Sequence, residues 1–304
     1  MSEIFDIIVV GAGPAGMTAA IYARRAAKSV LVLEAKMYGG QIVNTPDIEN
    51  YPVEAHISGF DFATKLYNQT KALGALIKIE KVIGIEDLGA NKKVVTTKNG
   101  YLAKAVILAT GSENRKLGLE NEDKLVGRGV SYCATCDGSF FRGKSVAVVG
   151  GGNTALEDAL YLSDICEKVY LIHRREGFRG DETSAERLKE RSNVEFVLNS
   201  NVTKLNASAR LESIEVTNKS GEVRTLEVSG IFVAVGRIPE NQDFASLIAL
   251  DNSGYAIAGE DCRTAVPGIF VAGDNRTKAV RQLVTAASDG AIAATEAVKY
   301  IGSL

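Results

Sequence analysis

The chain of 304 residues lacks several features that would point to particular functions. It has no surplus of positive charge, because 35 Lys and Arg stand against 37 Asp and Glu, and contacts to a nucleic acid backbone need such a surplus. Its longest hydrophobic runs, such as residues 7–10 and 30–33, are far shorter than the ~20 residues that cross a bilayer. We therefore exclude nucleic acid as the main partner and expect no membrane span.

Cysteine and histidine are also scarce, with four and two residues. The first six residues include acidic side chains and no basic stretch, so they do not resemble a signal peptide, and we expect the protein in the cytoplasm. A lasting structural disulfide is not expected in that compartment. Cys133 and Cys136 form the only C-x-x-C pair, and no second cysteine or histidine pair completes a zinc site, so we expect no metal. A redox-active dithiol remains, since this spacing lets a disulfide close within one helical turn.

Glycine, by contrast, is abundant, with 30 residues. An apolar run at 7–10 is followed by Gly11-Ala12-Gly13-Pro14-Ala15-Gly16, a helical stretch at 17–27, and a second strand at 29–33 that ends in Glu34. This order is typical of a dinucleotide-binding βαβ unit, in which glycines allow the turn and the approach of a pyrophosphate to the helix N-terminus. The acid would bind the ribose hydroxyls. A glycine-rich loop in another α/β domain is the alternative.

The same pattern returns in the second half of the chain. A strand at 145–149 leads into Gly150-Gly151-Gly152-Asn153-Thr154-Ala155, a helix at 156–166 and a strand at 168–172. Gly11 to Glu34 is 23 positions (34 − 11), as is Gly150 to His173 (173 − 150), so His173 takes the place of Glu34. A carboxylate repels a 2′-phosphate, whereas cations bind one, so the second site is predicted to take NADP(H). The residues suited to bind it are His173, Arg174, Arg175 and Arg179; for the arginines, a solvated basic surface is the alternative.

Further apolar runs indicate how the chain is organised. Residues 105–108, 230–235 and 268–272 each end in a glycine turn, and a helix is expected at about 281–300. The last strand and helix would complete the first unit if the chain returned to it. We therefore predict an α/β fold with two Rossmann-like, three-layer ββα dinucleotide-binding domains, the second inserted into the first: 1–116 and 243–304 around 117–242. Residues 78–101 and 194–226 are expected to form small antiparallel sheets.

The carboxylate of Asp137 directly follows the second cysteine. Dithiol chemistry releases a thiolate that must be protonated, and a carboxyl whose pKa is raised by burial can supply the proton. The alternative is that Asp137 only caps the following turn.

These motifs together resemble the low-molecular-weight, bacterial-type thioredoxin reductases, over nearly the whole chain. The resemblance implies that FAD occupies the first site, with Asp274, Arg281 and Gln282 closing over it. It rests on the glycine turns already quoted and on Gly39-Gly40-Gln41, Glu49-Asn50-Tyr51-Pro52, Cys133-Ala134-Thr135-Cys136-Asp137-Gly138, His173-Arg174-Arg175 with Phe178-Arg179, and Gly273-Asp274 with Arg281-Gln282. Implied FAD contacts are Gly11, Gly13, Pro14, Ala15, Gly16, Glu34, Ala35, Gly39, Gly40, Gln41, Asn50, Val82, Ala109, Thr110, Gly111, Gly273, Asp274, Arg281 and Gln282; implied NADPH contacts are Gly150, Gly152, Asn153, Thr154, Ala155, His173, Arg174, Arg175 and Arg179.

The resemblance also implies a relay from NADPH to FAD, to the Cys133–Cys136 disulfide, and on to the disulfide of thioredoxin or a thioredoxin-like protein. In this family Cys136 interacts with the flavin, Cys133 attacks the substrate, Asp137 is the acid/base, and the subunit forms a homodimer whose domains rotate about a hinge. Two other functions stay open: reduction of a different small dithiol protein, and a non-catalytic sensor of the NADPH/NADP ratio.

Two positions depart from the usual family pattern. Ser288 stands where the family generally has glycine, which puts in doubt how closely the last helix approaches the flavin. Arg237, in Gly236-Arg237-Ile238-Pro239, differs from the commoner turn and could alter the nucleotide contacts or the hinge.

Overall fold

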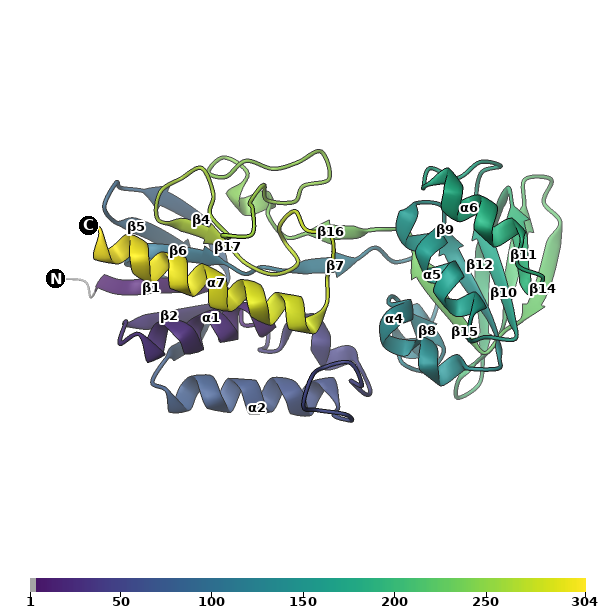
Figure 1. Ribbon diagram of the computed structural model, residues 1–304, viewed down its shortest axis with the longest axis horizontal. Coiled ribbons are helices and arrows are strands. Elements are labelled where there is room, and N and C mark those ends of the chain that lie inside the picture. Colours follow the sequence, from purple (N-terminus) through teal and green to yellow (C-terminus); the bar gives the residue numbers. More distant parts are fainter. Residues whose placement is uncertain (1–3) are drawn as a thin grey trace. The chain divides into compact units, whose positions relative to one another are not determined.

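A computed structural model describes residues 4–304 and divides the chain into two compact units (Figure 1). The first comprises the chain up to Glu113 and Ile238–Leu304, and the second comprises Asn114–Arg237. Both boundaries between the units lie a few residues before the domain boundaries predicted from the sequence. They fall in β7 (Ser112–Asn114) and β16 (Arg237–Pro239), which pair with each other as a two-stranded sheet.

The first unit is built on a seven-stranded sheet in the order β3-β2-β1-β6-β5-β4, with β17 also paired to β6. The strands read as apolar runs because both faces of the sheet are covered. One face packs on α1 and α7, and the other on residues 244–258. The strands are β1 (Ile4–Val10), β2 (Val30–Glu34), β3 (Leu76–Ile79), β4 (Val82–Asp87), β5 (Lys92–Thr96), β6 (Gly100–Leu108) and β17 (Ile269–Val271); the helices are α1 (Pro14–Arg25), η1 (Gly40–Asn44), α2 (Gly59–Ala72), η3 (Gln242–Phe244) and α7 (Leu283–Gly302).

The prediction of a separate antiparallel sheet at 78–101 was wrong. β4 and β5 continue the main sheet, because β6 is nine residues long and pairs along its length with different partners. Its first part is antiparallel to β5, and its last three residues are parallel to β17. One long strand therefore joins the parallel and antiparallel parts into one sheet.

The second unit has three layers, as predicted. A parallel sheet in the order β11-β10-β9-β15-β8 packs on helices on one face and on the antiparallel sheet β12-β13-β14 on the other. β11, predicted as part of the antiparallel stretch, instead joins the parallel sheet beside β10. The elements are α3 (Glu122–Leu125), β8 (Val130–Ser131), α4 (Ala134–Asp137), η2 (Gly138–Phe141), β9 (Ser145–Gly150), α5 (Asn153–Ser163), β10 (Lys168–His173), α6 (Glu182–Lys189), β11 (Val194–Leu198), β12 (Ser200–Ala207), β13 (Leu211–Asn218), β14 (Val223–Glu227) and β15 (Gly230–Ala234).

Both helices that follow the glycine turns begin three residues before their predicted start. α1 begins at Pro14 and α5 at Asn153, so the last residues of each turn already form the first turn of the helix. Proline is favoured at the first helical position because its fixed φ suits a helix and its missing N–H has no partner there. No helix among residues 4–304 is long and apolar enough to cross a membrane.

The last helix, α7, packs closely along α1, which α2 also contacts (Figure 1). The closest approach is at Gly290, where a Cβ would overlap the backbone oxygen of Ala15. Ser288 is exposed, so its departure from glycine does not affect this helix contact. The glycine that this packing requires is therefore two residues further along.

We predict that Gly290→Ala destabilises the protein by about 1–3 kcal/mol, the usual cost of overpacking, despite the higher helix propensity of alanine. Gly302→Ala is the matched control, because it lies at the end of the same helix and its Cβ would meet nothing within 4 Å. The measurement is the thermal midpoint followed by circular dichroism. A Gly290→Ala protein that melts with the control would contradict the packing argument.

Candidate functional site

The first glycine turn leaves the N-terminus of α1 open to an anion. Gly13 is the N-cap, no side chain caps the helix, and a Cβ on Gly13 would meet nothing within 4 Å. Gly11 has a φ of +105°, and a Cβ there would overlap the backbone of Ala109 at the end of β6. The carboxylate of Glu34 accepts hydrogen bonds from the backbone N–H groups of Ala12 (2.7 Å) and Lys36 (2.9 Å). The acid therefore lies beside the turn.

Predicted flavin residues of three other segments, residues 39–40, 109–110 and 273, lie against this turn. Gly39 donates its N–H to the Ala12 oxygen at 2.8 Å, and a Cβ on Gly40 would lie 3.3 Å from the Gly13 Cα. A Cβ on Gly273 would lie 2.9 Å from that of Ala15. Thr110 and Gly111 follow β6, and Asn50 Nδ2 donates to Gln282 Oε1 at 3.2 Å. Val82 is instead in the hydrophobic core, and Ala35 is exposed beyond β2.

Residues 273–282 form a loop between β17 and α7 that holds four of the predicted flavin contacts. The Arg281 guanidinium lies 4.1 Å over the Tyr255 ring, and its buried Nε has no hydrogen-bond partner among residues 4–304. Such a donor fits a ligand that supplies an acceptor. Sequence reasoning missed the side chains beneath this loop, Arg276, Lys278 and Asp289. The one signal available was that Asp289 is the only charged residue in the stretch 283–294.

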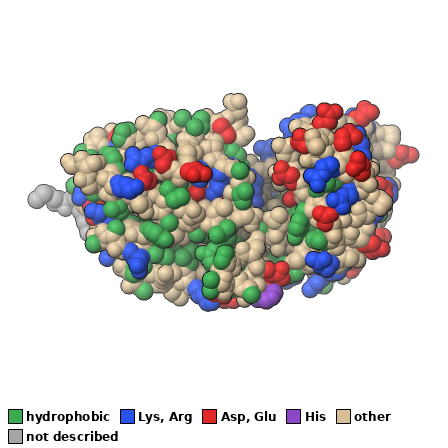
Figure 2. Space-filling view, viewed as in Figure 1, with side chains coloured by type: hydrophobic (Ala, Val, Ile, Leu, Met, Phe, Trp, Pro, Cys, Tyr) green, Lys and Arg blue, Asp and Glu red, His purple; other side chains and the backbone are tan. Residues whose placement is uncertain are grey.

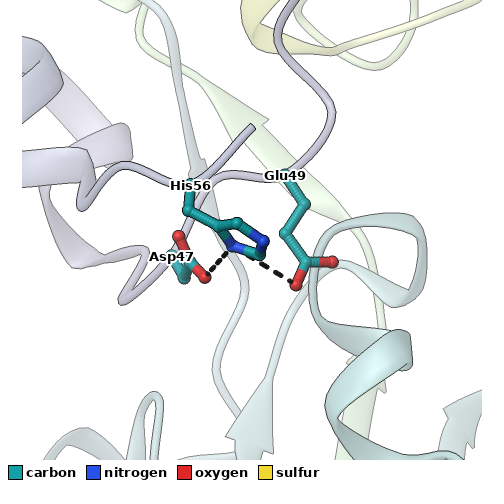
Figure 3. Close-up of side chains that lie close together, drawn as sticks. All are labelled: Asp47, Glu49 and His56. Carbon is teal, nitrogen blue, oxygen red and sulfur yellow. Dashed lines mark hydrogen bonds and ion pairs between the residues drawn. The ribbon is translucent and has the colours of Figure 1, made fainter. Parts of the chain in front are cut away.

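A group of charged side chains precedes and follows Asn50 (Figure 3). His56 Nδ1 lies 2.9 Å from Asp47 Oδ2 and 3.9 Å from Glu49 Oε1. Ile48 and Ile57 form an antiparallel bridge. Because successive side chains on such a segment point to opposite sides, their neighbours Asp47, Glu49 and His56 point to the same side and come close together. The hydrogen bond to Asp47 raises the pKa of His56 above its ordinary value. The three charged side chains thus lie close together on either side of Asn50 in the sequence.

The second glycine turn is open in the same way. Gly152 is the N-cap of α5 without a capping side chain, and a Cβ on it would meet nothing within 4 Å. The Gly151 oxygen accepts the N–H groups of Arg179 (2.7 Å) and Gly180 (3.2 Å), which folds the following loop back onto the turn. The arginine cluster (Arg174, Arg175 and Arg179) is exposed beside it. An anion on this turn would therefore meet guanidinium groups.

His173 plays a different part from the arginine cluster. Its side chain is buried, and a Cβ on Gly151 would overlap its ring, so the missing side chain at Gly151 makes room for it. The ring stacks on Phe178 with centroids 5.4 Å apart, and Nε2 has no partner among the described residues. Burial, and then the neighbouring arginines, lower the pKa of His173, so the ring is neutral. The positive charge of this site thus comes from the arginines.

The cysteine pair sits on a short helix at the end of β8. Cys133 is the N-cap of α4, and Cys133 and Cys136 are joined as a disulfide, with Cα atoms 5.3 Å apart. Ser131 holds this segment, since its hydroxyl accepts the Cys133 N–H at 3.1 Å. Cys166 and Cys262 are buried and not in a disulfide.

Asp137 shares the Ser131 hydroxyl with the cysteine pair. Ser131 donates to Asp137 Oδ2 at 2.6 Å, whereas the buried Oδ1 has no partner among residues 4–304. The side chain makes no capping bond to η2, so capping does not account for it. Burial raises the pKa of Asp137, although the bond from Ser131 opposes the shift. A raised pKa makes the carboxyl a better proton donor near neutral pH than an ordinary aspartate, and it follows the second cysteine directly.

The chain also matches a known protein family. The chain matches the family model of the pyridine nucleotide-disulphide oxidoreductases over residues 5–290, and it belongs to that family. Membership implies the use of a flavin and a pyridine nucleotide, and both open glycine turns fit a dinucleotide.

The particular relatives are thioredoxin reductases. That of Listeria innocua is 41% identical over 304 residues, which covers 99% of this chain and 95% of the relative. That of Treponema pallidum is 41% identical and covers 100% and 99%. Among solved structures, the thioredoxin reductase of Streptococcus pyogenes has a TM-score of 0.95 at 40% identity over 100% of both chains. That of Giardia duodenalis has a TM-score of 0.94 at 33% identity, over 99% of this chain and 100% of its own. The resemblance read from the motifs and the predicted fold class are confirmed.

The buried Asp137 carboxyl predicts a pH dependence of stability. Because its folded pKa is raised, the native state keeps the proton at pH values where the unfolded state has lost it. The contribution of Asp137 to stability is therefore full below the ordinary value of 3.8 and falls as the pH rises through the folded pKa. Asp137→Asn should remove this dependence, so the variant gains stability relative to the wild type as the pH rises from 4. Urea unfolding at several pH values measures the difference; parallel curves would contradict the raised pKa.

Proposed function

We propose that this protein is an NADPH-dependent, FAD-containing disulfide reductase that acts on thioredoxin in the cytoplasm. The observation that carries the proposal is the arrangement in the second unit. A C-x-x-C disulfide lies beside a partly buried acid, in the same unit as a nucleotide turn flanked by the arginine cluster. The names of the relatives support thioredoxin as the substrate.

The two glycine turns would hold the two cofactors. In the first unit, the α1 N-terminus would bind the pyrophosphate of FAD and Glu34 the ribose, with the 273–282 loop over the flavin. In the second unit, the α5 N-terminus would bind the pyrophosphate of NADPH and the arginine cluster its 2′-phosphate. A carboxylate in one place and guanidinium groups in the other account for the choice of nucleotide.

The cysteine chemistry follows from the segment 131–137. FAD held by the first glycine turn would supply the two-electron chemistry by which NADPH reduces the Cys133–Cys136 disulfide to the dithiol. The Cys133 thiolate then attacks the substrate disulfide, which forms a mixed disulfide and releases one substrate thiolate. Cys136 attacks the Cys133 sulfur, which restores the intramolecular disulfide and releases the second substrate thiolate. Asp137 would donate a proton to a leaving thiolate, with Ser131 holding its other oxygen.

The proposed relay involves both units. The cysteine pair and the predicted NADPH turn both belong to the second unit, whereas the predicted flavin residues belong to the first. We propose that the two present themselves to the flavin in turn, by rotation about β7 and β16. Glu240 donates its N–H to Gly111, and Arg115 donates to Gly236, so backbone bonds continue the pairing on both sides of this link.

The family resemblance further leads us to propose a homodimer. Hydrophobic side chains gather on the visible surface of the first unit over α7 and α2 (Figure 2). Phe60 on α2 and Val284 on α7 are exposed hydrophobic residues of this unit. Such a surface suits a protein interface. Sedimentation of the flavin-loaded protein would test the proposal.

The direct test of the enzyme class is the purified protein itself. We expect a yellow protein whose flavin absorbance NADPH bleaches. A colourless protein that binds no FAD would refute the proposed function.

We predict that Cys136→Ser abolishes NADPH-driven reduction of thioredoxin but leaves the bleaching of the flavin by NADPH intact, because only the later step needs the dithiol. Cys166→Ala is the control, since Cys166 is a buried free cysteine of the same unit. Both steps are followed by absorbance. A wild-type protein that binds both nucleotides yet reduces no disulfide protein would favour the sensor function instead.

We predict that replacing Arg174 and Arg175 with glutamine weakens NADPH use by ~1.5–3 kcal/mol per lost charged contact and leaves NADH use nearly unchanged. The measurement is kcat/KM for each nucleotide. Arg210→Gln, an exposed arginine between β12 and β13, is the control. Equal losses for NADPH and NADH would contradict the assignment of the 2′-phosphate site.

A further inference from the structure

The 273–282 loop is anchored from below by one buried carboxylate. Asp289, on α7, is 3% exposed. Its Oδ2 accepts hydrogen bonds from the Gly273 N–H (2.9 Å), Arg276 Nε (2.8 Å) and Lys278 Nζ (2.9 Å), and its Oδ1 accepts one from Arg276 Nη2 (2.7 Å). The carboxylate thus binds the loop at its first residue and at two further points.

The three charged groups are buried together. The side chains of Arg276 and Lys278 are 8% and 7% exposed. Burial alone raises the pKa of Asp289, but the bonds from Arg276 and Lys278 outweigh it and hold that pKa below its ordinary value. The carboxylate is therefore charged, and its removal would leave two buried cations without the countercharge that they share, although each keeps a bond to a backbone oxygen.

The backbone next to Asp289 is held in place by the contact between α7 and α1. The next residue, Gly290, makes the close backbone contact with Ala15 at the start of α1. The carboxylate is therefore set in position relative to the first glycine turn. Through it, the conformation of the loop is tied to the same turn that is predicted to bind the dinucleotide.

The anchor extends to the far end of the loop. The Arg276 oxygen accepts a hydrogen bond from Arg281 Nη2 at 3.2 Å. Asp289 therefore holds the Arg276 side chain, and the Arg276 backbone orients Arg281. Neither Asp289 nor Arg276 is among the residues expected to touch the flavin.

We propose that Asp289 is a positioning residue for the flavin site: by binding Gly273, Arg276 and Lys278 from beneath, it sets the 273–282 loop in the conformation that closes over the cofactor. This inference rests on the proposed function. It predicts that loss of the charge loosens the cofactor and alters its surroundings without removing any group that touches it.

The test is Asp289→Asn in the flavin-loaded protein, which keeps the shape of the side chain but not its charge. We expect release of FAD on dilution to be about tenfold faster or more, judged from the size of charged hydrogen bonds, with a changed visible spectrum of the flavin that remains bound. Glu296→Gln is the matched control. Glu296 also lies on α7 and binds one arginine and one lysine, Arg263 and Lys299, but at the surface of the helix away from the loop contacts described above.

A second variant covers the case in which Asp289→Asn does not fold, as judged by circular dichroism. Lys278→Met leaves the two bonds between Arg276 and Asp289 in place, and we expect a smaller increase in FAD release in the same direction. If the folded variant retains FAD and its spectrum as Glu296→Gln does, the positioning role is wrong while the proposed function stands. A wild-type protein that binds no flavin would overturn both.

Discussion

In each unit a glycine stands where a strand ends and a helix begins, and the structure requires that this residue has no side chain. At Gly11 any Cβ would overlap the backbone of Ala109, and at Gly150 it would overlap that of Ala234. The glycine thus lets the turn lie directly against the end of the neighbouring strand, β6 in the first unit and β15 in the second. An uncapped helix end of this kind is a site for an anion, and each unit contains one.

The two sites share this constraint and differ in the side chains that lie beside the turn. The backbone geometry is shared, with Glu34 and His173 both lying against the second residue of their turns, Ala12 and Gly151. The difference comes from charge: a carboxylate bound to backbone N–H groups in one unit, and a neutral buried ring with exposed arginines beside it in the other. One fold can in this way serve two nucleotides, while the disulfide and its acid occupy a third position, at the end of β8.

Much of the fold and of the candidate site could be predicted from the sequence, because short-range sequence patterns determine them. The glycine turns, the order of strand and helix, and the C-x-x-C pair are short-range patterns, and the resemblance they gave agrees with the relatives. The parts that failed depend on distant contacts. β4 and β5 belong to the main sheet and not to a sheet of their own, because β6 is long enough to pair with β5 as well as with the parallel strands. β11 belongs to the parallel sheet and not to the antiparallel one, because it pairs with β10. Asp289 lies on α7, whereas Arg276 and Lys278 lie in the loop before it. No pattern of spacing in the sequence indicates that these three side chains contact one another. His173 was expected to bind the 2′-phosphate together with the arginines, and no pattern in the sequence indicated that its ring is buried against Gly151.

The central claim is that electrons from NADPH reach thioredoxin through the cysteine pair. Oxidation of NADPH by the purified protein, followed with a panel of thioredoxin-like proteins as acceptors, tests it most directly. The account predicts turnover with an oxidised thioredoxin and with NADPH in preference to NADH. Flavin reduction without turnover on any dithiol acceptor would contradict it.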